Sequence, residues 1–314
     1  MRKNKRLLNA FIIFDLIVIA LLASYLFSFQ ETRSLDPVSR ADLPGQFIQL
    51  EDGVTHYELS GPQDGPLVVL VHGFSVPYYV WDPTVIGLNA AGFQVLRYDL
   101  FGRGYSDRPD VDYTLDLFVR QLSQLTGAVV PDKAFNLVGL SMGGPIVSAY
   151  ANRNPAHVLS LALVAPETQP VTAGTIFPMN VPLLGEWVMK VYMVPVYLPS
   201  SQAADAFNPA MLPDWEKRYR QQMEYKGFRK ALLSTIRHLP QMDALGEYRQ
   251  LAQSGIPVLL IWGEEDQSVT YDAIIKARQA LPQAEYLQLA QAGHLPHFEK
   301  ADLVNAALVK FFNQ

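Results

Sequence analysis

The sequence predicts an α/β fold in which a mostly parallel sheet is covered by helices on both faces. Apolar runs typical of buried strands recur near residues 67–71, 94–98, 134–138, 158–164, 257–262 and 285–289. They alternate with segments of helical periodicity, such as 114–126 and 271–281. Runs that are apolar throughout are typical of parallel strands buried on both sides. With 314 residues, of which 49% are hydrophobic, the chain is long enough for one large domain with an insertion.

The chain begins with a basic cluster followed by a long apolar stretch. Four basic residues within positions 1–6 precede residues 7–30, where Asp15 is the one charged residue. A helix of about 20 residues crosses a hydrocarbon core of about 30 Å, and Asp15 costs about 2.5–3.5 kcal/mol at the bilayer centre. We predict a basic tail (1–6), a transmembrane anchor (7–30) and a linker (31–45). A cleaved signal peptide is the alternative, but the stretch is long for one and no good cleavage site follows it.

The same basic cluster predicts on which side of the membrane the rest of the chain lies. Basic residues on the N-terminal side of the apolar stretch keep that end in the cytoplasm. The rest of the chain is then expected on the non-cytoplasmic side, which in a bacterium is the periplasm.

The strand run at 134–138 leads directly into Gly-Leu-Ser-Met-Gly at residues 139–143. Glycines two residues before and after a serine fit a sharp strand-to-helix turn, because no Cβ atom clashes where the backbone reverses. Helical spacing follows over 144–151, and Pro145 suits a first helical turn. The turn is expected to expose the hydroxyl of Ser141. The pattern is short, and an ordinary helix N-terminus is the alternative interpretation.

A serine nucleophile needs a base within hydrogen-bond reach and a third group that orients the base. Among six histidines, His294 is favoured over His297, because it follows the strand run 285–289 in a loop shaped by glycine and proline. The orienting acid should also follow a strand, and Gly-Glu-Glu-Asp comes directly after the run 257–262. Any of these three carboxylates fits, and Glu167 after an earlier strand is a further candidate.

From about residue 46 to the end, the chain resembles the serine-dependent α/β-hydrolases. The motifs in chain order are His-Gly-Phe at 72–74, the segment 97–106, the turn at Ser141, the acids at 264–266 and His294. Nucleophile, acid and histidine occur in the order of that family. The resemblance selects Asp266 as the acid, and it implies that the backbone N–H groups of Phe74 and Met142 form the oxyanion hole. His72 is expected to be structural.

The resemblance also implies a domain organisation. The α/β-hydrolase fold has an eight-stranded, mostly parallel sheet, and its core would be formed by residues 46–165 and 255–314. No buried parallel strand is evident between residues 166 and 254. Methionine and aromatic residues are frequent in that segment, which is predicted to be an inserted helical cap. Most of those side chains are expected in ordinary helix packing and the remainder at the pocket.

The predicted function is hydrolysis of a carboxylic ester by a Ser-His-Asp acyl-enzyme mechanism. The apolar cap and the anchor favour a lipophilic ester, as in membrane-anchored monoacylglycerol lipases of this fold. Carbon–carbon bond hydrolases and acyltransferases share the same three residue types, so both remain alternatives. A non-catalytic binding protein on the same scaffold is a third, although no member of the triad is missing.

Composition bounds the possible partners. The chain has 25 Lys and Arg against 30 Asp and Glu, and four of the basic residues lie in the N-terminal cluster, so nucleic-acid binding is not expected. The absence of cysteine excludes disulfides and a lipid-modified N-terminal cysteine. No cofactor or metal is predicted, and the sequence does not predict an oligomeric state.

Overall fold

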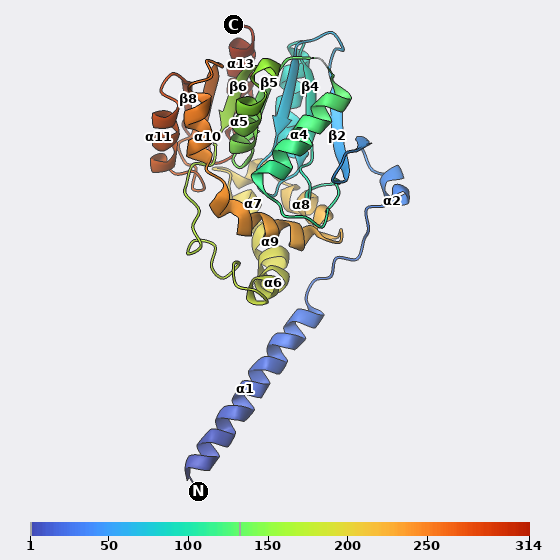
Figure 1. Cartoon of the computed structure of the whole chain (residues 1–314), viewed down its shortest axis with the longest axis vertical. Helices are drawn as coiled ribbons and strands as arrows, with labels where there is room; N and C mark the ends of the chain where they lie inside the picture. The colour runs from blue at the N-terminus through green and yellow to red at the C-terminus, as the bar shows by residue number, and fades with distance from the viewer. Residues whose placement is uncertain (1, 132) are drawn as a thin grey trace.

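Eight strands form a single sheet in the order β1-β2-β4-β3-β5-β6-β7-β8 in the computed structural model, which describes residues 2–131 and 133–314 (Figure 1). The strands are β1 (Gln46–Gln49), β2 (Val54–Ser60), β3 (Leu67–Val71), β4 (Gln94–Tyr98), β5 (Phe135–Leu140), β6 (Val158–Val164), β7 (Val258–Gly263) and β8 (Glu285–Leu289). β1 pairs antiparallel with β2 and β2 with β4, whereas all later pairs are parallel. The predicted mostly parallel sheet is confirmed.

The central strands are apolar on both sides because both sides of the sheet are covered. All five residues of β3 are buried, and their side chains alternate between two cores. Val69 and Val71 belong to one core, whereas Val68 and Leu70 belong to the other. This alternation explains why β3 lacks the polar positions of a half-exposed sheet.

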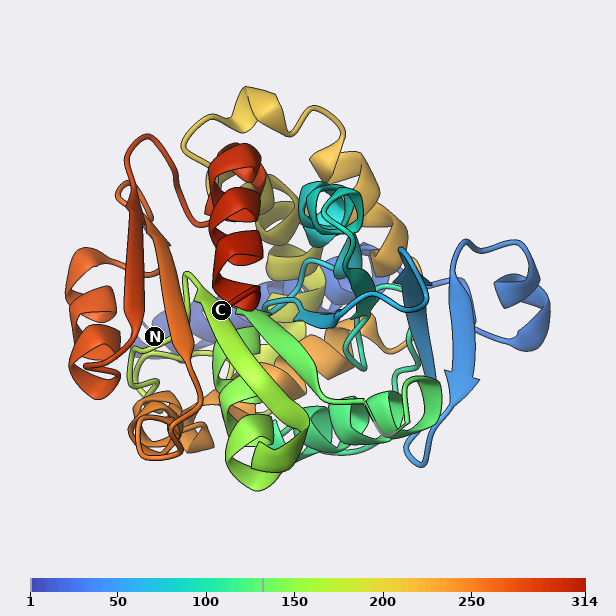
Figure 2. The ribbon, with the colours of Figure 1, turned by 90° about the horizontal axis from the view of Figure 1, so that it is seen from above.

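Helices cover the sheet on both faces (Figure 2). One core contains residues of α4 (Leu115–Val129), α5 (Gly143–Arg153), α10 (Ala244–Leu251) and α11 (Tyr271–Ala280). The other contains residues of α3 (Asp82–Ala90) and α13 (Ala301–Phe312). Other short helices are α2 (Pro37–Ala41), η1 (Tyr78–Trp81), η2 (Pro155–His157), η5 (Leu239–Gln241) and α12 (Pro296–Glu299).

The segment between β6 and α10 is helical and lies at the end of the sheet nearer α1 (Figure 1). Its helices are α6 (Leu184–Val188), η3 (Met189–Tyr197), α7 (Leu198–Ala204), η4 (Pro209–Met211), α8 (Trp215–Met223) and α9 (Phe228–His238). They share a core of their own that includes Met189, Tyr219 and Phe228. Residues 215–238 form two helices: α8 ends at Met223, and Gly227, whose φ is +93°, immediately precedes α9.

The long helix α1 (Arg2–Phe27) projects from the domain (Figure 1). Its segment Leu7–Phe27 is long and apolar enough to cross a membrane, and none of its residues is buried. A membrane anchor and a signal sequence share these properties. The helix ends before the predicted limit of residue 30, because the Gln30 side-chain amide binds the Leu26 carbonyl at 2.9 Å and Phe29 packs on the core of the helical segment. The side chains of the predicted basic tail, residues 1–6, lie outside the described part of the structure.

Residues 31–45, predicted as a linker, are held against the domain. The carboxylate of Glu31 accepts hydrogen bonds from the backbone N–H and the side-chain Nε of Arg229, at 2.8 and 3.0 Å. The segment also contains the short helix α2, whose first turn is capped by Asp36. The connection between α1 and the sheet is therefore ordered by contacts that its polar sequence did not predict.

Candidate active site

Ser141 lies at the tip of the turn between β5 and α5. Its φ of +52° is in the left-handed region that residues with a side chain rarely adopt. Three hydrogen bonds hold this backbone in place. Ser141 N–H donates to the Val164 carbonyl at 3.0 Å, and the Ser141 carbonyl accepts from the N–H groups of Gly144 and Glu167, at 2.8 and 3.1 Å. Strain of this kind persists only where the surroundings enforce it, as they often do at functional sites.

The flanking glycines are required by close packing of the backbone. A Cβ atom on Gly139 would lie 2.5 Å from the carbonyl oxygen of Gly143. A Cβ atom on Gly143 would lie 2.4 Å from the carbonyl oxygen of Val71. Gly73 also approaches the serine, since a Cβ there would lie 3.1 Å from the Cβ of Ser141. The glycine pattern of the sequence therefore has the steric cause inferred for it.

His294 and Asp266 form a buried hydrogen-bonded pair. The Nδ1 atom of His294 lies 2.8 Å from Oδ2 of Asp266, and both residues are buried. The other carboxylate oxygen, Oδ1, accepts the N–H groups of Ser268 and Val269, each at 2.8 Å. Because a carboxylate only accepts, Nδ1 carries the hydrogen, and Nε2 is left for a second partner.

The loop that carries His294 is held by three consecutive backbone N–H groups, at residues 292–294. The N–H of residue 292 donates to the Glu265 carboxylate at 3.0 Å, and that of residue 293 donates to the Glu299 carboxylate at 2.7 Å. The N–H of His294 donates to the backbone carbonyl of Asp205 at 2.8 Å. Glu265, one of the three candidate acids, thus contacts the loop backbone. Glu299 and Asp205 were not predicted as site residues. Glu299 follows Gly293 by six residues but belongs to no motif, whereas only the tertiary fold brings Asp205 to this loop.

The electrostatic environment favours a protonated His294. Burial opposes its positive charge, but the carboxylate of Asp266, supported by Asp205 and Glu167, outweighs burial and raises the pKa of His294 to about 9. Burial also raises the pKa of both Asp205 and Glu167. The Glu167 carboxylate accepts the N–H groups of the next two residues, whereas Asp266 is the acid bonded to the imidazole.

Ser141 and His294 line one cavity of about 230 Å³ between the sheet and the helical segment. The lining residues are Gly73, Phe74, Ser75, Val76, Leu140, Ser141, Tyr197, Ser201, Gln202, Asp205, Ser268, His294 and Leu295. Met142 is buried beside Ser141 without lining the cavity. Within the described part of the chain, the backbone N–H groups of Phe74 and Met142 donate to no protein acceptor, which leaves both available to a ligand.

The rival histidines have structural contacts. His297 is fully buried, with Nε2 at 3.1 Å from the Val80 carbonyl and its ring 4.5 Å from that of Trp81. Burial lowers the pKa of His297 to about 3. His72 accepts the Leu100 N–H through Nε2 at 2.9 Å, in agreement with the structural role expected for it.

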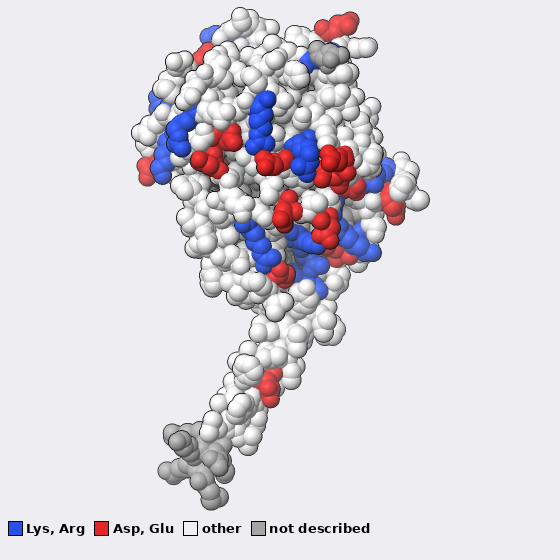
Figure 3. All heavy atoms as spheres, viewed as in Figure 1, with Lys and Arg blue, Asp and Glu red and all other residues white. Residues whose placement is uncertain are grey.

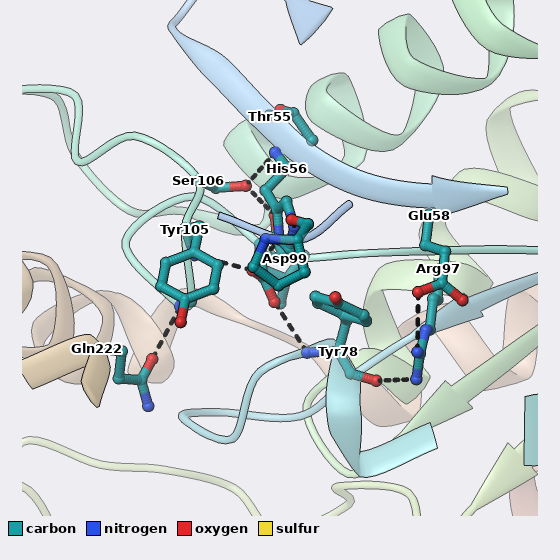
Figure 4. Close-up of polar contacts among 12 residues, drawn as sticks. Thr55, His56, Glu58, Tyr78, Arg97, Asp99, Tyr105, Ser106 and Gln222 are labelled. Carbon is teal, nitrogen blue, oxygen red and sulfur yellow. Dashed lines mark hydrogen bonds and ion pairs between the residues drawn. The ribbon is translucent and has the colours of Figure 1, made fainter. Parts of the chain in front are cut away.

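A second buried His–Asp pair, His56 and Asp99, does not line the cavity; its polar contacts are drawn in Figure 4. Nδ1 of His56 is 2.7 Å from Oδ2 of Asp99, and its Nε2 is 2.7 Å from the Pro44 carbonyl. Asp99 also accepts the N–H groups of Tyr78 and Tyr105, each at 2.8 Å. Because both imidazole nitrogens of His56 are occupied, this pair ties the N-terminal hairpin to the loops after β3 and β4.

Within residues 2–131 and 133–314, no group of three or more His, Asp or Glu side chains is arranged to hold a metal ion. The acidic groups at the cavity instead surround an imidazole. The arrangement can therefore supply a hydroxyl, an oriented imidazole and two backbone N–H donors around one small cavity.

Comparison with known proteins agrees with this architecture. Residues 68–307 match the sequence profile of the alpha/beta hydrolase family. Lipase 1 of Psychrobacter immobilis is 29% identical over 277 residues, covering 84% of this chain and 82% of the lipase. The AB hydrolase superfamily protein YfhM of Bacillus subtilis is 25% identical over 285 residues, covering 85% of this chain and 96% of YfhM.

Solved structures show the same fold. The enol-lactonase of Burkholderia xenovorans LB400 superposes with a TM-score of 0.73 at 23% identity, over 86% of this chain and all of that one. A meta-cleavage product hydrolase of Pseudomonas fluorescens IP01 superposes with a TM-score of 0.71 at 22% identity, over 86% of this chain and 97% of that one. The profile match spans most of the chain, so this protein is a hydrolase that belongs to the alpha/beta hydrolase family.

Proposed function

We propose that the protein hydrolyses carboxylic esters through an acyl-enzyme intermediate on Ser141. The observation that carries the proposal is the shared cavity. Ser141 and His294 both line it, and Asp266 accepts a hydrogen bond from Nδ1 of the His294 imidazole. His294 would take the serine proton as Oγ attacks the carbonyl carbon, and would return it to the leaving alcohol. Water, activated by the same imidazole, would then cleave the acyl-enzyme and restore Ser141.

The negative charge of the tetrahedral intermediate would be stabilised by backbone donors. The N–H groups of Phe74 and Met142 donate to no other described residue. Phe74 lines the same cavity as Ser141, and Met142 follows Ser141 in the sequence. Oxyanion donors of this kind contribute about 3–4 kcal/mol each where they have been measured. The side chains of these two residues are incidental to the role.

The cavity supports an ester whose reactive end is small. A volume of about 230 Å³ is below the roughly 300–1,000 Å³ of pockets that enclose a drug-sized ligand. Polar side chains from the helical segment, among them Ser201, Gln202 and Asp205, line it. We infer that the ester and a short polar group occupy the cavity, and that the chain of a lipophilic substrate extends outward past Tyr197.

An ester panel tests this function. p-Nitrophenyl esters of increasing acyl length, monoacylglycerols and a ring-cleavage product should be assayed side by side with the full-length protein. We expect turnover of the esters and none of the ring-cleavage product. Exclusive turnover of the ring-cleavage product would instead favour the carbon–carbon bond hydrolase alternative, the activity named for one of the structural relatives.

The pH dependence of ester hydrolysis follows from His294. Because the imidazole must be neutral to accept the serine proton, and its pKa is raised to about 9, kcat/KM should rise with pH up to about 9 and then level off. Replacement of Asp205 by Asn removes one of the negative charges that raise this pKa, so the rise should move to lower pH. A wild-type profile already flat from pH 6 upward would contradict the raised pKa of His294, although not ester hydrolysis itself.

We also propose that residues 166–254 act as a cap over the cavity and that α1 is an uncleaved anchor. The supporting observations are the cap residues in the cavity lining and the apolar span Leu7–Phe27. The catalytic domain would then lie on the non-cytoplasmic side. A reporter active only outside the cytoplasm, fused after Gln314, should be active; an inactive fusion would refute that side.

A further inference from the structure

The helical segment presents large apolar side chains to solvent next to α1. They are Phe177, Leu183, Tyr192, Val196 and Tyr197, and we call them the cap apolar surface. Leu183 is 84% exposed and Phe177 65% exposed, although such side chains are normally buried when they have no partner. Exposed apolar patches of this kind mark surfaces that bind another protein, a ligand or a membrane.

The segment is fixed to the apolar helix by direct contacts. The indole Nε1 of Trp187 donates to the Leu21 carbonyl at 3.2 Å and to the Ser24 hydroxyl at 3.1 Å. The ammonium of Lys190 lies 4.1 Å from the centre of the Tyr25 ring. These contacts come from α6 and η3. Tyr192, Val196 and Tyr197 of the cap apolar surface also belong to η3, and Leu183 immediately precedes α6.

The chain that follows α1 strengthens this attachment. Phe29 packs on the core of the helical segment. Two residues later, Glu31 binds Arg229, and Arg33 then forms backbone hydrogen bonds with Glu224 and Lys226, at 3.0 and 2.9 Å. The orientation of the domain relative to α1 is therefore set by packing and hydrogen bonds.

The contacts between α1 and the helical segment determine how deep this segment would lie in a bilayer that α1 spans. Leu21, which Trp187 contacts, precedes the helix end at Phe27 by six residues, or about 9 Å along the axis at 1.5 Å per residue. If α1 spans a bilayer over Leu7–Phe27, Trp187 lies about 9 Å inside that end of the span, a depth comparable with the roughly 5–10 Å to which amphipathic surfaces enter the headgroup and acyl boundary. Residues 7–27 of α1 contain Asp15 as their one charged residue, whereas Lys, Arg, Asp and Glu gather on the visible face of the domain just beyond the end of the helix (Figure 3).

We propose that the cap apolar surface docks on the lipid bilayer that holds α1, so that the cavity opens at the membrane surface. The occupant of this surface is lipid, because the surface is continuous with a helix of bilayer-spanning length. Tyr197 links the two sites, since it lines the cavity and also belongs to the cap apolar surface. An amphiphilic ester could then enter head first while its chain stays in the bilayer. The proposal rests on the proposed anchor and ester hydrolysis.

Cysteine labelling measures the docking directly, because the natural sequence has no cysteine. Leu183→Cys and, as the matched control, Leu303→Cys on α13 each place one exposed thiol for an environment-sensitive fluorophore. The full-length variants are reconstituted in phosphatidylcholine vesicles. We expect the probe at 183 to be quenched by nitroxide-labelled lipid and protected from aqueous iodide, and the probe at 303 to show the reverse. Equal iodide quenching at both positions would overturn the proposal.

Activity measurements separate the docking from the chemistry. In Leu183→Asp, hydrolysis of a water-soluble short ester should stay at the wild-type rate, because residue 183 lies outside the cavity lining. Hydrolysis of an ester embedded in the vesicles should fall about tenfold, which corresponds to about 1.4 kcal/mol. The control Leu303→Asp should change neither rate. An unchanged rate on the embedded ester would contradict the docking, whereas a wild-type protein inactive on both esters would contradict the proposed function.

Discussion

Replacement of Ser141 by Ala should abolish covalent labelling by a fluorophosphonate and lower kcat for ester hydrolysis by about 10⁶-fold, if this site behaves like a known serine triad. The reason is the loss of the hydroxyl that would carry the acyl group in the cavity that Ser141 shares with the oriented imidazole. His294→Ala should lower kcat by a similar factor, because the members of a triad act as a unit.

Ser148→Ala is the matched control for the Ser141 variant. Ser148 lies in the helix that follows the turn and is buried, but it does not line the cavity. Labelling and kcat should stay at the wild-type level in this control. A folded wild-type protein that does not react with the probe would end the serine-hydrolase proposal, as would full labelling of Ser141→Ala.

Replacement of Asp266 by Asn should lower kcat by about 10⁴-fold, as loss of the orienting carboxylate does in a serine triad. The amide oxygen of Asn can still accept the N–H groups of Ser268 and Val269, so the loop should keep its structure. Its NH₂ group would donate to Nδ1 of His294 and favour the wrong tautomer. Steady-state kinetics, together with circular dichroism to check folding, measures the effect.

Glu167→Gln is the corresponding test of the rival acid. Its carboxylate accepts backbone N–H groups of its own turn, and hydrogen bonds of that kind remain possible for an amide oxygen. We expect kcat within tenfold of wild type. If Asp266→Asn retained activity within tenfold and Glu167→Gln did not, the orienting role would belong to Glu167.

The local sequence was sufficient for the fold class because the responsible interactions repeat at short range. A strand buried on both sides must be apolar at every position, as β3 is, and this signal is visible in five residues. The same holds for the turn at Ser141, where Gly139 and Gly143 are required by clashes within a few residues. The helical segment was located by the absence of such strands, but its division at Gly227 was not predicted.

The candidate site was only partly visible in the sequence because its partners are distant along the chain. Three acids follow β7, and hydrogen-bond geometry in the folded chain distinguishes Asp266, which contacts the imidazole, from Glu265, which contacts the loop backbone. Asp205 carries no local pattern and reaches the loop of His294 only through packing of the helical segment. Glu299 lies close by in sequence, at the end of α12, but no motif marks it as a partner of the loop.

The sequence by itself determined the α/β class, the apolar N-terminal helix and the serine turn, since each depends on neighbouring residues and on the solvent they require. Only the tertiary structure decided which acid meets the imidazole, how small the cavity is, and that Trp187 contacts Leu21. Those features depend on side chains from separate elements meeting within about 3 Å, a distance set by the packing of the whole chain.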